Sequence, residues 1–462
     1  MVARTSDDDA NTIIENKSQL VAYLESGCKA SEKFRLGTEL ELFVFRAEEF
    51  APAEYDSPSP CIRDLLNQML RFGWTPTDAN DLAVGLTREG CTITLEPGGQ
   101  FEFSSPPLSD VHHIFEHTKI YQNELKSAGS ELGLSFLAMG HQPKHARLDL
   151  PWMPKERYRI MRDYMPKRGS LGLDMMQSTA SLQVAIDFAS EADMVQKFRV
   201  ALALQPVVTA LFANSPFVKG QPSGYLSYRA HIWKNTDNDR SGSLPFVFET
   251  DMGFERYTDY VLDVPMYFVH RDGRYIDATG SSFRDFLAGQ LSVLPGERPR
   301  LQDWIDHLTT VFPSTRLKTF LEMRGADAGP GRSRSPALAA LWTGILYDPT
   351  VLDAAWERIR TWTNEERLNL ELGVPIHGFD TPFREGTVRD LCQWILDLAK
   401  DGLDRRALRN TQGEDETKYL EPLFDAVREG RTFAEELLQR FDQEWSRDID
   451  RAVRVLCEET LT

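Results

Sequence analysis

The chain has 462 residues, of which 41% are hydrophobic and 26% are charged, as in an ordinary globular protein. Its formal net charge of −18 argues against a nucleic-acid partner, because that kind of binding depends on clustered Lys and Arg side chains. The longest apolar run, residues 200–213, contains Gln205 and Pro206 and is shorter than the ~20 residues that span a bilayer, which argues against a membrane partner.

The cysteines are scattered along the chain and form no CxxC pair. They are Cys28, Cys61, Cys91, Cys392 and Cys457. Scattered single cysteines favour free thiols in a reducing compartment. The first ten residues are acidic and do not resemble the basic and then apolar start of a secretory leader. We therefore predict a cytoplasmic location.

The sequence shows no clear linker, internal repeat or low-complexity segment. We predict an N-terminal helical segment at residues 1–30 and a catalytic domain at residues 31–350. Residues 351–462 have the periodicity of helices, and we expect them to pack on the same domain.

Four segments far apart in the chain alternate between apolar and polar residues, as half-buried strands do. They are residues 34–45, 91–104, 181–188 and 317–324. Side chains of a strand point alternately to its two faces, so each segment places its acids or amides on one face. The side chains on these polar faces are Glu39, Glu41, Glu96, Glu102, Gln183 and Glu322. Glu96 and Glu102 flank the Pro97-Gly98-Gly99 turn of a predicted hairpin. A solvated sheet face is the alternative explanation for any one segment.

Two other clusters leave two interpretations open. His112, His113 and His117 lie in a predicted helix at residues 110–131, where they are either metal ligands or ordinary surface residues. The irregular segment 143–167 is rich in cations, which either form a solvated surface or belong to a lid that meets phosphate. Its cations include Lys144, Lys155, Arg157, Arg159, Arg162 and Lys167.

Five glutamates on one sheet surface repel one another strongly. Two carboxylates about 4 Å apart repel by roughly 4 kcal/mol at an effective dielectric constant of 20. Hard divalent cations prefer oxygen ligands, and magnesium usually shares its coordination shell with substrate phosphates. The pattern therefore predicts a carboxylate-lined site for magnesium and a nucleotide.

Nine stretches between residues 34 and 350 resemble the plant and proteobacterial type of glutamate–cysteine ligase. The stretches are residues 95–104 (LEPGGQFEFS), 164–176, 190–198, 210–217, 231–233, 237–242, 264–268, 283–289 and 322–327. The resemblance implies an α+β fold of the glutamine-synthetase-like carboxylate–amine ligase type. In that fold a curved, mainly antiparallel sheet carries the metals on its concave face, with helices outside and a helical C-terminal part. It also implies ATP as co-substrate and Mg²⁺ as cofactor, with Mn²⁺ possible.

The resemblance implies roles for particular residues. We expect Glu39, Glu41, Glu96, Glu102 and Glu322 to bind the metal, with Gln183 beside them. Arg229 and Arg324 match arginines that the family places around glutamate and the transferred phosphate, and a structural ion pair is the alternative for each. Arg162 and Lys167 are further candidates for binding phosphate.

The sequence departs from the family pattern at several positions. Ala185 stands where related enzymes usually carry asparagine, on the same face as Gln183. Ala180 stands where the plant enzymes have a regulatory cysteine, and residues 325–336 contain no cysteine. We therefore expect no thiol switch of the plant kind. Leu40 and Leu42 also differ from the family pattern, on the face opposite the glutamates.

We predict an ATP-dependent ligase that joins the γ-carboxylate of L-glutamate to the amine of L-cysteine through a γ-glutamyl phosphate, the first step of glutathione synthesis. One alternative is a paralogous ligase that uses a different amine. Two alternatives from different functional classes are a phosphotransferase on the same sheet and a non-catalytic binding protein. The expected partners are small-molecule substrates only, in a monomer or homodimer.

Overall fold

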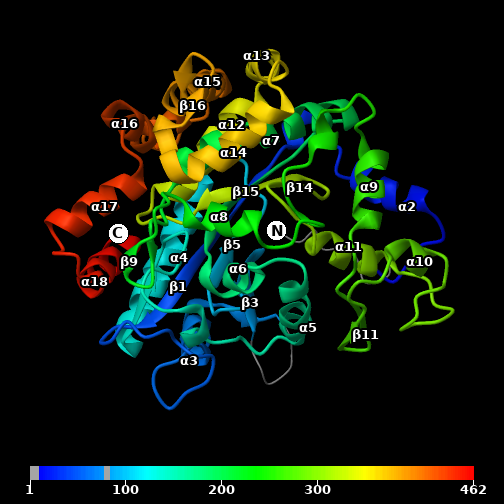
Figure 1. The fold of residues 1–462 in the computed structure, drawn as a ribbon, viewed down its shortest axis with the longest axis horizontal. Helices are drawn as coiled ribbons and strands as arrows, with labels where there is room; N and C mark the ends of the chain where they lie inside the picture. The colour runs from blue at the N-terminus through cyan, green and yellow to red at the C-terminus, as the bar shows by residue number, and fades with distance from the viewer. Residues whose placement is uncertain (1–9, 78–83) are drawn as a thin grey trace.

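The computed structural model describes residues 10–77 and 84–462, and within them nine strands form one sheet (Figure 1). The strand order is β14-β15-β7-β1-β5-β4-β3-β2, with β6 paired to the far end of β1. Every pairing in this sheet is antiparallel. The strands are β1 (Leu36–Arg46), β2 (Thr75–Pro76), β3 (Gly85–Arg88), β4 (Cys91–Leu95), β5 (Phe101–Ser104), β6 (Leu134–Leu137), β7 (Ser181–Ile186), β14 (Thr315–Leu317) and β15 (Leu321–Asp327). The predicted α+β class with a mainly antiparallel sheet is confirmed.

The strand register brings the predicted polar residues together. Glu41 pairs with Glu102 across β1 and β5, and Glu39 pairs with Gln183 across β1 and β7. Glu322 of β15 lies opposite Ala185 of β7. Because side chains alternate along each strand, these residues share one face of the sheet.

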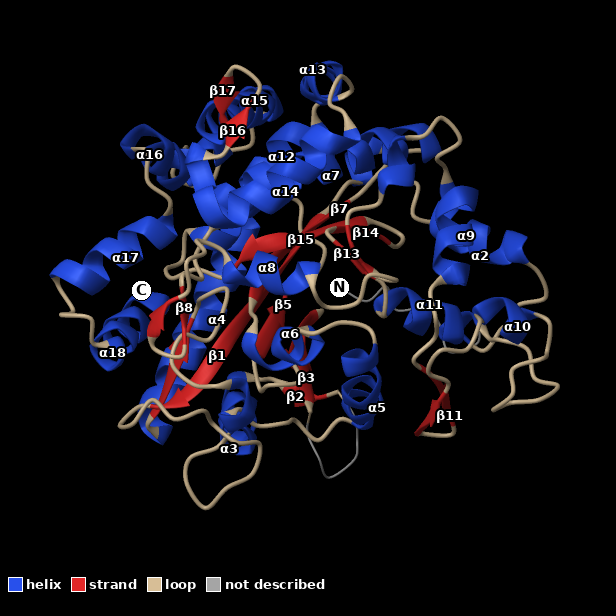
Figure 2. Cartoon of the chain, in the orientation of Figure 1, coloured by secondary structure: helices blue, strands red, loops and turns tan. Residues whose placement is uncertain are grey.

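Helices cover the apolar face of the sheet (Figure 2). They are α4 (Val111–Leu132), α7 (Glu191–Phe212) and α12 (Arg334–Tyr347). Phe103 of β5 stacks on Tyr121 of α4 with ring centroids 4.5 Å apart, and Leu40, Phe103 and Ile186 are fully or almost fully buried. Burial of this face therefore fixes which face remains for the polar residues.

Shorter elements surround the polar face, where α5, α6 and α8 lie in front of the sheet (Figure 1). The helices of the first 310 residues outside the core layer are α2 (Lys17–Glu25), α3 (Ile62–Met69), α5 (Glu156–Tyr164), α6 (Gly172–Ser178), α8 (Tyr228–Lys234), α9 (Phe254–Asp263), α10 (Phe283–Leu287) and α11 (Leu301–Thr309). The short strand pairs are β8 (Phe217–Val218) with β9 (Gln221–Pro222), β10 (Ser241–Gly242) with β13 (Phe312–Pro313), and β11 (Phe268–Arg271) with β12 (Arg274–Asp277).

The C-terminal region is almost entirely helical. It contains α13 (Pro349–Ile359), α14 (Asn364–His377), α15 (Val388–Arg406), α16 (Glu421–Glu429), α17 (Phe433–Gln443), α18 (Ile449–Thr460) and one small hairpin of β16 (Pro382–Phe383) and β17 (Gly386–Thr387). One cluster of buried apolar residues extends from Ile14 to Leu461 and includes this region. In the described part of the chain, no helix is both long and apolar enough to cross a membrane.

Helices α12 and α15 cross at two glycines. A Cβ built on Gly402 would lie 1.9 Å from the carbonyl oxygen of Gly344, and one built on Gly344 would lie 2.2 Å from that of Ala399. Neither neighbour is a flexible side chain, so the close approach of the two helices requires glycine at both positions.

We therefore expect Gly402→Ala to destabilise the protein by about 1–3 kcal/mol or more, because the new methyl group forces the two backbones apart. Thermal or urea unfolding measures the change. Asp401→Ala, at the exposed neighbouring position, is the control and should change stability by no more than about 0.5 kcal/mol. Equal stability of the two variants would contradict the close packing of α12 on α15.

Candidate active site

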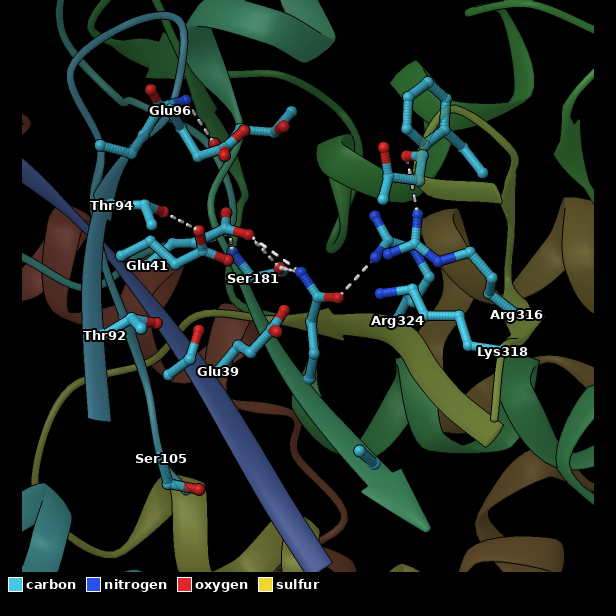
Figure 3. A pocket seen from close by; sticks show the side chains of 18 of the residues that line it. Glu39, Glu41, Thr92, Thr94, Glu96, Ser105, Ser181, Arg316, Lys318 and Arg324 are labelled. Carbon is cyan, nitrogen blue, oxygen red and sulfur yellow. Dashed lines mark hydrogen bonds between the residues drawn. The ribbon is translucent and has the colours of Figure 1, made fainter. Parts of the chain in front are cut away.

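A cavity of about 800 Å³ lies on the polar face of the sheet (Figure 3). Six of the residues predicted from the strands and the family resemblance line it together with Arg324. They are Glu39, Glu41, Glu96, Glu102, Gln183 and Arg229. Figure 3 shows the glutamates on one side of the cavity and Arg316, Lys318 and Arg324 on the other side. The cavity wall is therefore divided into an anionic part and a cationic part.

The anionic wall consists of Glu39 and Glu41 of β1, Glu102 of β5 and Glu96, which directly follows β4. Glu41 accepts hydrogen bonds from the backbone N–H and the hydroxyl of Ser181, both at 2.8 Å, and from Gln183 Nε2 at 3.1 Å. Burial, reinforced by the charge of Glu96, nevertheless raises the pKa of Glu41 to about 7.

Glu102 lies at the centre of this anionic wall. Burial raises the pKa of Glu102 well above its usual range, and the charges of Glu39, Glu96 and Glu41 add to the effect. The hydroxyl of Thr94 donates a hydrogen bond to Glu102 and opposes this shift. The charges of these three carboxylates therefore disfavour ionisation of Glu102, and a bound cation would favour it.

The donor set of the anionic wall fits a hard divalent cation. All four side chains offer carboxylate oxygens to the same cavity, and Mg²⁺ prefers oxygen ligands. Across residues 10–77 and 84–462, no three His, Cys, Asp or Glu side chains converge tightly enough to form a ready-made metal cluster.

Glu322 has a different environment from the other four glutamates. Its carboxylate contacts Arg316 Nη2 at 2.6 Å, Arg324 Nη1 at 2.8 Å and Lys318 Nζ at 3.0 Å. Burial alone would raise the pKa of Glu322, but the charges of Arg316, Lys318 and Arg324 outweigh it and hold the pKa well below its usual range. Glu322 therefore holds three cations in one row beside the cavity.

Sequence reasoning missed Arg316 and Lys318, which both line the cavity. Arg316 lies directly opposite Glu322 in the pairing of β14 with β15. The sequence contains a pattern that could have identified both residues, because Arg316 and Lys318 occupy even-numbered positions, as Glu322 and Arg324 do. The prediction of a single strand at residues 317–324 is wrong, because the chain forms a hairpin there in which β14 (Thr315–Leu317) pairs with β15 (Leu321–Asp327).

Gln183 links the two walls. Arg324 Nη1 donates to Gln183 Oε1 at 2.6 Å, while Gln183 Nε2 donates to Glu41 at 3.1 Å. Arg229 Nη2 donates to the carbonyl oxygen of Arg324 at 2.8 Å, and its Nη1 lies 4.0 Å from Asp327 Oδ1. The two predicted arginines are therefore neighbours, fixed by contacts with β7 and β15. Ala185 also lines the cavity and offers no amide there.

Helix α5 brings part of the basic segment to the cavity. Lys155, Arg157, Tyr158 and Met161 line the cavity, and Tyr158 OH and Lys155 Nζ donate to the carbonyl oxygen of Leu95 at 2.7 and 2.8 Å. This contact places α5 beside Glu96.

Arg162 and Lys167 are exposed and do not line the cavity. Arg162 follows Arg157 by five residues, which is about 140° around a helix, and its guanidinium lies over Trp152 at 4.7 Å. The position of α5 therefore favours Lys155 and Arg157 over Arg162 and Lys167 for contact with phosphate.

The three histidines of α4 have separate partners. His112 contacts the Tyr419 hydroxyl at 2.9 Å, His113 contacts Asp110 at 2.6 Å, and His117 contacts Cys91 Sγ at 3.5 Å. They do not form a common metal-binding set within the described residues.

A protein-family model described as glutamate–cysteine ligase family 2 matches residues 35–455. The chain is 52% identical over 435 residues to the chloroplastic glutamate–cysteine ligase B of Oryza sativa subsp. japonica, covering 94% of this chain and 86% of that protein. It is 50% identical to the chloroplastic glutamate–cysteine ligase of Arabidopsis thaliana, covering 94% and 81% of the two chains.

A crystal structure of glutamate–cysteine ligase from Francisella tularensis in complex with AMP has a similar fold. Its TM-score is 0.55 at 12% sequence identity, and the match covers 93% of this chain and 89% of that one. At this identity the similarity supports the fold of the sheet and its helices.

The names of the plant relatives contradict one prediction. A cytoplasmic location was expected, but these relatives are chloroplastic enzymes, and the prediction is therefore wrong. All five cysteines are free in the structure.

In excess chelator, we expect substitutions of Glu102 and Glu322 to have different effects on the free energy of unfolding. Glu102→Gln replaces a carboxyl group whose pKa is raised by burial and by its neighbours with a neutral amide of the same shape, so we expect unchanged or slightly higher stability. Glu322→Gln leaves three buried cations without their shared anion, so we expect a loss of about 3–5 kcal/mol. Urea unfolding measures both changes. Addition of Mg²⁺ should raise the unfolding midpoint of the unmodified protein more than that of Glu102→Gln. A large loss of stability in Glu102→Gln would contradict the unfavourable ionisation of Glu102.

Proposed function

The chain belongs to glutamate–cysteine ligase family 2, and we propose that its divided cavity joins the γ-carboxylate of L-glutamate to the amine of L-cysteine with ATP as co-substrate. The family membership confirms the resemblance seen in the sequence. The relatives are glutamate–cysteine ligases and do not support an acceptor other than cysteine. The observation that carries the proposal is the carboxylate wall facing a row of three cations across one cavity.

We assign Glu39, Glu41, Glu96 and Glu102 as ligands for Mg²⁺, with Mn²⁺ as an alternative ion. A bound divalent cation would neutralise negative charge on the ATP phosphates. The raised pKa values of Glu41 and Glu102, which come from burial and from the neighbouring carboxylates, support this assignment because a bound cation would offset them. Glu322 was expected among the metal ligands, but its three ion pairs favour a role in holding Arg316, Lys318 and Arg324 in place.

The cationic row is suited to the transferred phosphate. Arg316, Lys318 and Arg324 would hold the γ-phosphate oxygens while an oxygen of the glutamate γ-carboxylate attacks the phosphorus and ADP leaves. Arg324 is also hydrogen-bonded to Gln183, so its position is coupled to that of Glu41 on the opposite wall. Arg229 is placed to bind a carboxylate of glutamate through its guanidinium.

The second step forms the amide bond. The amine of cysteine attacks the carbonyl carbon of γ-glutamyl phosphate, inorganic phosphate leaves, and the amine loses a proton. Exclusion of water protects the acyl phosphate from hydrolysis. Tyr158 and Met161 of α5 cover the cavity beside Glu96 and contribute to this exclusion.

An amine panel tests the proposed function. We expect ADP and γ-glutamylcysteine to form only when glutamate, cysteine, ATP and a divalent cation are all present. Because Ala185 offers no amide to the acceptor, we also expect measurable turnover with 2-aminobutyrate. Chromatographic identification of the product gives the answer. Full turnover in excess chelator would overturn the metal assignment, and a tenfold preference in kcat/KM for another amine would overturn the choice of cysteine.

Arg324→Lys keeps the charge but loses the planar guanidinium group, whose Nη1 contacts both Gln183 and Glu322. We expect kcat/KM to fall at least about 30-fold, which corresponds to a loss of about 2–4 kcal/mol of transition-state stabilisation. Steady-state kinetics with saturating ATP measure the change. Arg162→Lys on the exposed side of α5 is the matched control and should change the rate less than twofold. A loss below threefold in Arg324→Lys would show that Arg324 has only a structural role.

A further inference from the structure

A fully buried ion pair lies between α8 and β10, in the stretch 237–242. Arg240 is 0% exposed and Asp237 is 1% exposed, and Arg240 Nε donates to Asp237 Oδ2 at 2.7 Å. The guanidinium carbon of Arg240 lies 3.8 Å from the centroid of the Tyr267 ring. Neither Arg240 nor Asp237 lines the cavity, so neither side chain is placed to touch a substrate there.

The remaining nitrogen atoms of Arg240 bind two backbone carbonyl groups. Nη1 donates to the carbonyl oxygen of Thr310 at 3.2 Å, and Nη2 donates to that of Pro265 at 2.7 Å. The backbone of Arg240 takes part as well, because its carbonyl oxygen accepts a hydrogen bond from the N–H of Phe312 at 2.7 Å. The pairing of β10 with β13 continues this contact. Arg240 therefore fixes residues 310–312, at the junction of α11 and β13.

The same junction holds Arg316, a member of the row of three cations beside the cavity (Figure 3). Arg316 Nη1 donates to the carbonyl oxygens of Thr309 at 3.0 Å and Val311 at 3.2 Å. The carbonyl group between them, that of Thr310, is the one that Arg240 binds. Two arginines thus hold three successive carbonyl groups, and a shift of this backbone would turn the guanidinium of Arg316.

We propose that Arg240 is a positioning residue for phosphate transfer, because it fixes the backbone that orients Arg316 toward the γ-phosphate of ATP. The proposal rests on the proposed ligase function, in which Arg316 meets that phosphate. Misplacement of a group by about 1 Å can lower a rate on the order of 100-fold. Loss of the contacts with Thr310 and Pro265 should therefore impair turnover although Arg240 touches no substrate.

A purely structural role of the ion pair is the alternative, because removal of one partner of a buried pair destabilises a fold. The two roles differ in their consequences for nucleotide binding. Orientation of Arg316 concerns the γ-phosphate, which ATP has and ADP lacks. A general loss of structure would weaken the binding of both nucleotides to the same extent.

Arg240→Lys tests the proposal, since lysine keeps the charge beside Asp237 but cannot make all three side-chain contacts of the guanidinium. Titration calorimetry with MgATP or MgADP in the absence of glutamate measures the two dissociation constants. We expect the constant for MgATP to rise at least about fivefold while that for MgADP changes less than about twofold. With both amino acids present, we expect kcat to fall at least about tenfold.

Arg440→Lys is the matched control. Arg440 of α17 is also ion-paired, through Nη1 to Glu459 at 3.1 Å and through Nη2 at 2.7 Å, and it does not line the cavity. Both dissociation constants and kcat should stay within about twofold in this variant.

A double variant separates an effect exerted through Arg316 from an independent one. If Arg240 acts through Arg316, Arg240→Lys should lower the kcat/KM of ATP less than about twofold in a protein that already carries Arg316→Lys. Independent effects of the two substitutions would multiply, and that outcome would overturn the proposal.

If Arg240→Lys does not fold, Asp237→Asn provides the second variant, because asparagine keeps the size of the side chain and removes the charge beside Arg240. We expect the same selective loss of MgATP affinity, by at least about threefold.

Equal changes in the affinities for MgATP and MgADP in a folded variant would overturn the proposal, as would unchanged affinities for both. Neither result would affect the ligase function. Absence of γ-glutamylcysteine with the unmodified protein would instead overturn the proposed function, so the two failures are distinguishable.

Discussion

The separation of charge across one cavity is the constraint on which the site depends. Glu322 is buried and neutralises Arg316, Lys318 and Arg324, so three cations are held side by side on β14 and β15. On the other wall, burial and the charges of Glu39, Glu96 and Glu41 outweigh the hydrogen bond from Thr94 and hold the pKa of Glu102 well above its usual range. The cavity thus presents positive charge on one wall and a group of carboxylates on the other.

The antiparallel register makes this separation possible. Pairing of β1 with β5 and β7 places Glu41 beside Glu102 and Glu39 beside Gln183, and a slip of one residue would move all of them to the apolar face. Burial of that apolar face against α4, α7 and α12 excludes the slipped register. Burial of the apolar face therefore stabilises both the fold and the positions of the polar side chains in the cavity. Gln183 couples the two walls through its contacts with Arg324 and Glu41.

The segments around the sheet decide which side chains reach the substrates. α5 is seated on the turn beside Glu96 by Tyr158, and this orientation selects Arg157 and turns Arg162 outward. The orientation of α5 does not belong to the repetitive pattern of the sheet, because the elements packed against this helix set it.

The sequence by itself determined the alternating strands, the polar face with its glutamates and the family, because a period of two and long ordered motifs are local properties of the chain. The prediction from the sequence missed Arg316 because it placed one strand at residues 317–324, where the chain instead forms the hairpin of β14 and β15. Tertiary structure alone decided that Glu322 faces three cations while Glu102 faces other carboxylates, since charge pairing depends on neighbours distant in sequence. It also decided the direction of Arg162, because the rotation of a helix is set by the elements packed against it.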